Sequence, residues 1–197
     1  MKSLYIFIVI ILMGELSYAQ TQEEIIVTLA QNAASIKCLN CRFTQQKLMA
    51  ILESPTVAEG YMSYNSPDKM SWEYTSPYPF KLVVDGEKIT KINNGIEEDF
   101  DEKTTRAYKG IVNVIKSITT GENLFDKSKF DIFVHDTGGF WEVIMQPKKN
   151  SIKRMFAMLT IYFEKMDNVM NELEIIAANG DITKIQFIDI RINELCN

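Results

Sequence analysis

Three cysteines and one histidine are the residues of this 197-residue chain best suited to redox, nucleophilic or metal chemistry. Cys38 and Cys41 form a C-x-x-C pair, and Cys196 lies beside the carboxyl terminus. In redox modules such a pair usually opens a helix that follows a strand. Here the pair follows a predicted helix and precedes a predicted strand. We therefore favour a local clip, a Cys38–Cys41 disulfide, or two packed thiols over redox catalysis.

The sequence contains no residue pattern typical of nucleophilic catalysis or of a zinc site. His135, the single histidine, lies on a predicted strand beside a turn, which favours a surface or hydrogen-bonded role over that of a catalytic base. The cysteines and His135 are too widely scattered for the usual spacings of a tetrahedral zinc site. We expect no catalytic residue, metal or cofactor, and no enzymatic activity.

An acidic stretch at residues 97–102, with the sequence EEDFDE, could supply paired carboxylates or calcium ligands. It lacks the glycine spacing of a calcium loop. It also falls between two predicted structural segments. A solvated loop is therefore the favoured interpretation.

The amino terminus is typical of a secretory signal peptide. Lys2 precedes an unbroken apolar run from Leu4 to Met13, and small residues follow at Ser17 and Ala19. A membrane-spanning helix needs about 20 apolar residues, so this run is too short for an anchor. We expect residues 1–19 to be removed. No cysteine follows the cleavage site, so residues 20–197 should form a soluble, non-lipidated domain in the periplasm.

The formal net charge is −5. This mildly acidic balance favours solubility and argues against a binder of nucleic acid or of anionic membranes. The length suits one domain with a sizeable core, and no linker or repeat divides it. We expect a monomer.

The hydrophobic pattern predicts an α+β chain. Residues 23–36 carry apolar side chains on one helical stripe, and afterwards the period changes to that of strands. About ten strands follow, separated by turn residues such as Asp85-Gly86. Their predicted ranges are 42–52, 57–64, 69–75, 80–85, 88–93, 130–135, 140–146, 155–164, 169–178 and 183–192.

Two features suggest that the sheet encloses more than an ordinary core. Residues 155–163 are apolar on both faces of a predicted strand, so both faces must be covered. Residues 107–119 interrupt the strands with a helical pattern and could form one cover. The ten methionines suit a cavity for irregular apolar guests. An ordinary filled core remains the alternative.

An ordered set of short motifs resembles the LolA family of periplasmic outer-membrane lipoprotein carriers. The set spans nearly the whole mature chain and ends at Asn193. The matching segments are FTQQK at 43–47, EGYMSY at 59–64, PDKMSWEY at 67–74, Pro77, VDG at 84–86 and GDITKIQF at 180–187.

The resemblance implies an incomplete antiparallel β-barrel of about ten to eleven strands, with an N-terminal helix and lid helices over an apolar cavity. Some family members hold the lid with an arginine before the proline of the tryptophan strand, where this chain has Ser66. The resemblance places Trp72 and Tyr74 on the concave sheet and Phe43 near the start of the cavity. We expect the cavity to be lined also by Met70, Leu82, Val84, Trp141 and Met158. The resemblance assigns to the lid the residues Ile111, Val112, Ile115 and Ile118.

The function implied by this resemblance is the transport of acylated lipoproteins. Such a carrier takes its cargo from an inner-membrane ATP-driven extractor and releases it to an outer-membrane acceptor, if one exists. It requires an oily interior that is partly vacant. A carrier or sensor of another envelope lipid or glycolipid on the same half-barrel is the alternative.

Overall fold

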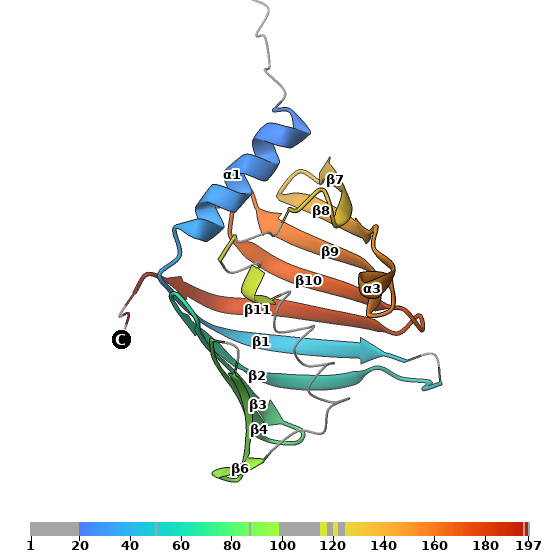
Figure 1. Cartoon of the computed structure of the whole chain (residues 1–197). Helices are drawn as coiled ribbons and strands as arrows, with labels where there is room; N and C mark the ends of the chain where they lie inside the picture. Colours follow the sequence, from blue (N-terminus) through green and yellow to red (C-terminus); the bar gives the residue numbers. More distant parts are fainter. Residues whose placement is uncertain are drawn as a thin grey trace, which may run out of the picture.

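The computed structural model describes residues 20–49, 51–86, 88–98, 115–117, 120–121, 125–194 and 196. In this part of the chain, eleven antiparallel strands form one open, curled sheet with the order β6-β5-β4-β3-β2-β1-β11-β10-β9-β8-β7 (Figure 1). The strands are β1 (Cys38–Leu48), β2 (Thr56–Asn65), β3 (Lys69–Ser76), β4 (Phe80–Asp85), β5 (Lys88–Asn93), β6 (Ile96–Glu98), β7 (Phe130–Asp136), β8 (Phe140–Pro147), β9 (Phe156–Glu164), β10 (Met170–Ala177) and β11 (Ile182–Ile192). The helices are α1 (Gln22–Ala34) and the short α3 (Asn150–Lys153).

The two halves of the chain form one sheet because the first strand, β1, pairs with the last strand, β11. β1 pairs with β2 on one side and with β11 on the other. The ten predicted strands are all present, although β1 begins at Cys38, four residues earlier than expected. The predicted α+β fold with an open, curled sheet is confirmed.

The eleventh strand, β6, corrects the interpretation of the acidic stretch as a loop. Glu97 and Glu98 lie on β6, which pairs with β5. Lys91 and Asn93 on β5 donate hydrogen bonds to the Glu98 carboxylate, and these bonds lower the pKa of Glu98. The carboxylate is therefore held by cross-strand partners, which a local charge pattern does not reveal. Residues 99–102 lie outside the described residues.

Strand register decides which side chains share the concave face. Residues directly opposite each other in an antiparallel pair point to the same side of the sheet. Two buried rows that cross the sheet in this way are Cys41, Met62, Trp72 and Leu82, and Val143, Ile161, Leu173 and Ile185. The core of the protein therefore lies on this one face.

Helix α1 covers part of the concave face (Figure 1). Its first turn is fixed by a capping box, in which the Thr21 hydroxyl accepts from the Glu24 amide and the Glu24 carboxylate accepts from the Thr21 amide. The predicted stripe is buried at Ile25, Ile26 and Leu29. The helix begins one residue earlier than predicted and ends two residues earlier.

Side-chain hydrogen bonds attach both ends of α1 to the far half of the sheet. Near its start, the Gln22 amide donates to the Ile132 carbonyl on β7 at 2.8 Å. Near its end, the Asn32 amide donates to the carbonyls of Asp167 and Asn168 in the β9–β10 turn, at 3.2 and 3.0 Å. These bonds fix the angle at which the helix crosses the strands.

The predicted Cys38–Cys41 disulfide is wrong. Cys38 is bonded to Cys196, with their Cα atoms 5.4 Å apart, and Cys41 keeps a buried free thiol. Cys38 and Cys41 both lie on β1, where three residues span about 10 Å, and Cα atoms of a disulfide lie within about 7 Å. Side chains three apart on a strand also point to opposite faces.

Candidate functional site

Aromatic rings form the centre of the concave face near β1, β3 and β11. Phe43 stacks on Trp72 with ring centroids 4.1 Å apart. Tyr74 meets Phe43 edge-on at 5.4 Å and stacks with Phe80 at 4.6 Å. Phe187 meets Trp72 edge-on at 6.2 Å. Broad, rigid rings of this kind present apolar surface with few internal rotations.

Few polar atoms interrupt this surface. The Tyr74 hydroxyl donates to the Gln45 side-chain oxygen at 3.0 Å. The Trp72 indole nitrogen is buried and has no hydrogen-bond partner among the described residues. An unpaired buried donor costs free energy, so this position is set by packing rather than by polar recognition.

Most of the predicted cavity residues lie on the concave face. Phe43, Met70, Trp72, Leu82 and Val84 are buried in the core, and Tyr74 and Trp141 are partly buried against it. Trp141 lies opposite Phe163, which places its ring on the same side.

Met158 is the exception, and its assignment to the cavity is wrong. On β9 it alternates with Leu159 and Ile161, whose side chains form the core, and it pairs with Ile176 on the convex side. A bulge at Ala157 returns Phe156 to the concave face. Because β9 is apolar on both faces, its sequence alone did not reveal which residues point inward.

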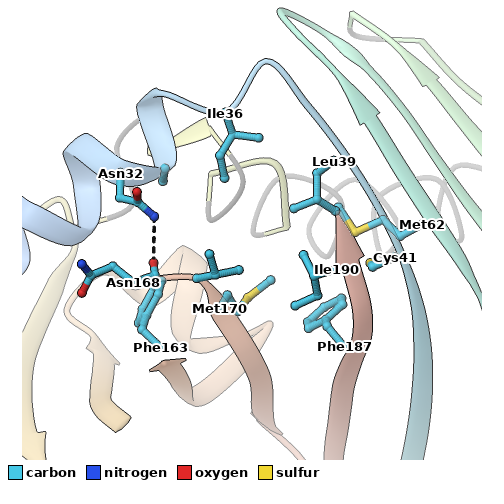
Figure 2. A pocket seen from close by; sticks show the side chains of 12 residues that line it. Asn32, Ile36, Leu39, Cys41, Met62, Phe163, Asn168, Met170, Phe187 and Ile190 are labelled. Atoms are coloured by element: carbon cyan, nitrogen blue, oxygen red, sulfur yellow. Dashed lines mark hydrogen bonds between the residues drawn. The ribbon is translucent and has the colours of Figure 1, made fainter. Parts of the chain in front are cut away.

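A small apolar pocket lies between the end of α1 and the concave face (Figure 2). Figure 2 shows Asn32 reaching to Asn168 at one side of it. Its free space is about 20 Å³, room for roughly one water molecule and far less than an acyl chain needs. The lining residues are Asn32, Ala33, Ile36, Leu39, Cys41, Met62, Phe163, Asn168, Val169, Met170, Phe187 and Ile190.

This pocket is smaller than the vacancy expected from the sequence. The protein's own side chains fill the concave face beneath α1. Burial raises the pKa of the Cys41 thiol in the pocket wall to about 12, so it stays protonated at neutral pH. This pocket could therefore hold an acyl chain only if the elements that cover it moved away.

The predicted lid is partly described. Ile115, Lys116 and Ser117 are helical, and Ile115 is 2% exposed within the core cluster. Lys116 forms an ion pair with Asp68 in the β2–β3 turn. Ile111, Val112 and Ile118 lie outside the described residues.

Gly121, which follows this helical turn in the chain, lies against α1. It adopts a positive φ of 70°, and a Cβ there would lie 2.5 Å from the Ala30 carbonyl oxygen. A larger residue would therefore be excluded on both conformational and steric grounds. The described part of the lid segment contacts both the sheet and the helix that covers it.

The titratable groups on the convex face form a structural network. His135 lies 3.1 Å from the Glu142 carboxylate, and Tyr162 donates a hydrogen bond to the same carboxylate. Desolvation and this bond raise the pKa of Tyr162 to about 12. In the described residues, no cluster of three His, Cys, Asp or Glu side chains could hold a metal ion. None of the described helices is long and apolar enough to span a membrane.

A family model described as "Outer membrane lipoprotein carrier protein LolA" matches residues 34–196. The chain belongs to the LolA family. Two relatives, each named "Outer-membrane lipoprotein carrier protein", align with most of this chain. The relative from Azotobacter vinelandii is 24% identical over 91% of this chain and 83% of its own. The relative from Pseudomonas entomophila is 25% identical over 92% and 84%, respectively.

A solved structure supports the fold. An uncharacterized conserved protein from Thermus thermophilus superposes with a TM-score of 0.50 at 9% identity, over 89% of this chain and 90% of that protein. The family model and both relatives are described as outer-membrane lipoprotein carrier proteins.

Proposed function

We propose that this protein ferries acylated lipoproteins across the periplasm, binding their acyl chains on the concave face of the sheet. It receives them from an inner-membrane ATP-driven extractor and gives them up at the outer membrane, to an acceptor where one exists. A signal peptide at residues 1–19 directs it to that compartment. It acts as a soluble monomer.

The observation that carries this proposal is the apolar concave face and the way it is covered. The rows from Leu82 to Cys41 and from Ile185 to Val143 are continuous across the sheet, yet α1 and the Ile115 turn are separate elements laid over them. Displacing those elements would uncover a broad apolar surface without breaking a strand pair. The cargo's acyl chains would then replace the protein's own covering side chains.

The energetics require such a binding face. Exposing an acyl chain of about 15 methylenes to water costs roughly 12 kcal/mol, at about 0.8 kcal/mol per methylene. Unassisted crossing of an aqueous gap is therefore negligible. A carrier must also release its cargo, so the closed and open forms should differ by only a few kcal/mol. When the cargo leaves, the covering elements bury the concave face again. This burial offsets the apolar burial lost with the acyl chains.

The decisive experiment incubates the purified protein with inner-membrane vesicles that hold a radiolabelled lipoprotein, the extractor and ATP. We expect labelled lipoprotein to appear in the soluble fraction as a complex with this protein. Release no greater than in a buffer control would end the carrier proposal. If the protein instead co-purifies with another lipid, identified by mass spectrometry, the alternative cargo is supported.

A matched pair of aromatic variants tests the face. Trp141→Asp introduces a charge on the concave side, and Phe133→Asp does so on the convex side, where Phe133 pairs with Ile144. Both side chains are partly exposed, so both variants should fold. Only Trp141→Asp should reduce release of the lipoprotein.

A further inference from the structure

One end of the sheet combines exposed apolar and basic side chains. β1 and β8 end there, β2 and β9 begin there, and Figure 1 shows the β1–β2 connection, α3 and the β10–β11 turn together at that end. The β3–β4 turn, next to the start of β2, belongs to the same end. We call this the basic–apolar edge and define it by Ile51, Leu52, Tyr78, Lys149, Lys153 and Arg154.

The apolar side chains of this edge lie on protruding turns. Ile51 is 88% exposed and Leu52 is 44% exposed, both between β1 and β2, and Tyr78 is 81% exposed between β3 and β4. Large apolar side chains exposed together mark interaction sites. Turns that project outward offer no groove for a peptide, but they can enter a soft, deformable interface. Tyrosine is itself enriched at membrane–water interfaces.

The basic side chains flank the apolar turns. Residues 148–154 contain four bases and no acid, in a chain whose net charge is −5. Lys148 is paired with Asp131, whereas Lys149, Lys153 and Arg154 have no ion pair among the described residues. All three are exposed.

The two parts are close enough to meet one flat surface together. β9, which follows α3, is three strands from β1 in the sheet order, which corresponds to about 15 Å at about 4.8 Å per strand. Acidic groups also occur at this end, at Glu53 and Asp181. The three unpaired bases and the neighbouring Lys47 outnumber them.

We propose that the basic–apolar edge docks the protein on an anionic lipid surface, with Ile51, Leu52 and Tyr78 entering the headgroup region and the bases facing lipid phosphates. Apolar insertion and attraction to anionic lipid are the two terms that hold peripheral proteins on membranes. The overall negative charge does not exclude membrane binding, because at this edge three unpaired bases lie beside exposed apolar side chains. This contact needs no lipoprotein cargo and is separate from the concave face.

Co-sedimentation with vesicles tests the proposal. Wild-type protein is mixed with vesicles of phosphatidylcholine alone, or of equal parts phosphatidylcholine and phosphatidylglycerol. We expect pelleting with the anionic vesicles, weaker pelleting with neutral ones, and a loss at high salt. Lys149→Gln, Lys153→Gln and Arg154→Gln together should weaken binding by about fivefold for each charge removed. Ile51→Asp should weaken it separately.

The opposite end of the sheet provides matched controls. Met166, 92% exposed in the β9–β10 turn, is changed to Asp as the partner of Ile51→Asp. Lys37→Gln, Lys69→Gln and Lys88→Gln together remove the same charge from exposed sites at that end. These controls should bind the anionic vesicles nearly as wild type does.

Two results would overturn the proposal. One is equal loss of binding in the edge and control variants, which would indicate a general charge effect. The other is failure of the wild-type protein to pellet with anionic vesicles, which would point to an acidic protein surface as the partner of this edge. Circular dichroism checks that every variant keeps its sheet.

Discussion

Lys116 and Asp68 form an ion pair that joins the helical turn over the concave face to the β2–β3 turn. Asp68 lies two residues after Ser66, the position where some LolA proteins carry the arginine that holds the lid. In this chain the basic partner is on the helical turn and the acidic partner is on the sheet. The pair therefore ties the described part of the helical turn to the sheet.

Breaking this ion pair should favour opening of the concave face. Asp68→Asn or Lys116→Gln should raise the affinity for a fluorescent fatty acid by about 1.4- to fivefold, because partly exposed ion pairs contribute roughly 0.2–1 kcal/mol. Glu73→Gln, which breaks the Lys81–Glu73 pair on the sheet, is the control and should leave uptake unchanged. Equal affinity in the wild type, both ion-pair variants and the control would show that the Lys116–Asp68 pair does not keep the concave face covered.

A charge at Ile115 should displace the helical turn and leave the sheet intact. Ile115 is buried against the core, and burying a carboxylate there is far costlier than moving the turn away. Ile115→Glu should therefore weaken lipid uptake while keeping the β-sheet circular dichroism signal. Val27→Glu, at an exposed position of α1, should retain uptake. Loss of the sheet signal in Ile115→Glu would make this residue structural.

Replacing Trp72 by phenylalanine should cost little stability. Trp72→Phe keeps the stack on Phe43 and removes a buried indole N–H that has no partner among the described residues. Relief of that unpaired donor, about 1–3 kcal/mol, offsets the smaller ring's lost packing. Urea unfolding should show a change within about 1 kcal/mol, against about 3–5 kcal/mol for Trp72→Ala. A large loss in Trp72→Phe would mean that the indole donor is satisfied.

The three cysteines should differ sharply in reactivity. In the native protein Cys41 should resist iodoacetamide at pH 7–9, since burial raises its pKa to about 12 and leaves almost no thiolate. After denaturation without reductant, one thiol per chain should react. Two reactive thiols in the native state would contradict the Cys38–Cys196 bond.

The same pKa shift predicts how stability responds to alkaline pH. The pKa of Cys41 is about 12 in the native protein, whereas the same thiol in the unfolded chain has its ordinary pKa of 9.0. The contribution of this thiol to the free energy of unfolding is therefore complete below pH 9 and is lost as pH rises toward 12. In urea unfolding, the stability of Cys41→Ala should fall less steeply over that range than the stability of the wild type.

Removing the disulfide should destabilise the protein at neutral pH. Cys196→Ser should lower the free energy of unfolding by about 2–5 kcal/mol, because it opens the Cys38–Cys196 bond.

Local periodicity was enough to predict much of this fold. The stripe of Ile25, Ile26 and Leu29 indicated α1, and the alternation of Met70, Trp72 and Tyr74 identified a strand with one apolar face. These patterns repeat within a few residues, so the chain itself records them. The ordered motifs from 43–47 to 180–187 likewise indicated the LolA family.

Only the tertiary structure decided the features that depend on distant partners or on strand phase. Alternation with the inward-facing Leu159 and Ile161 placed Met158 on the convex side, the C-terminal segment brought Cys196 to Cys38, and the β2–β3 turn brought Asp68 to Lys116. No spacing along the chain encodes such contacts, because they depend on how the eleven described strands curl and on which strand ends lie together. The extent of free space beneath α1 was decided in the same way, since it depends on how facing side chains pack.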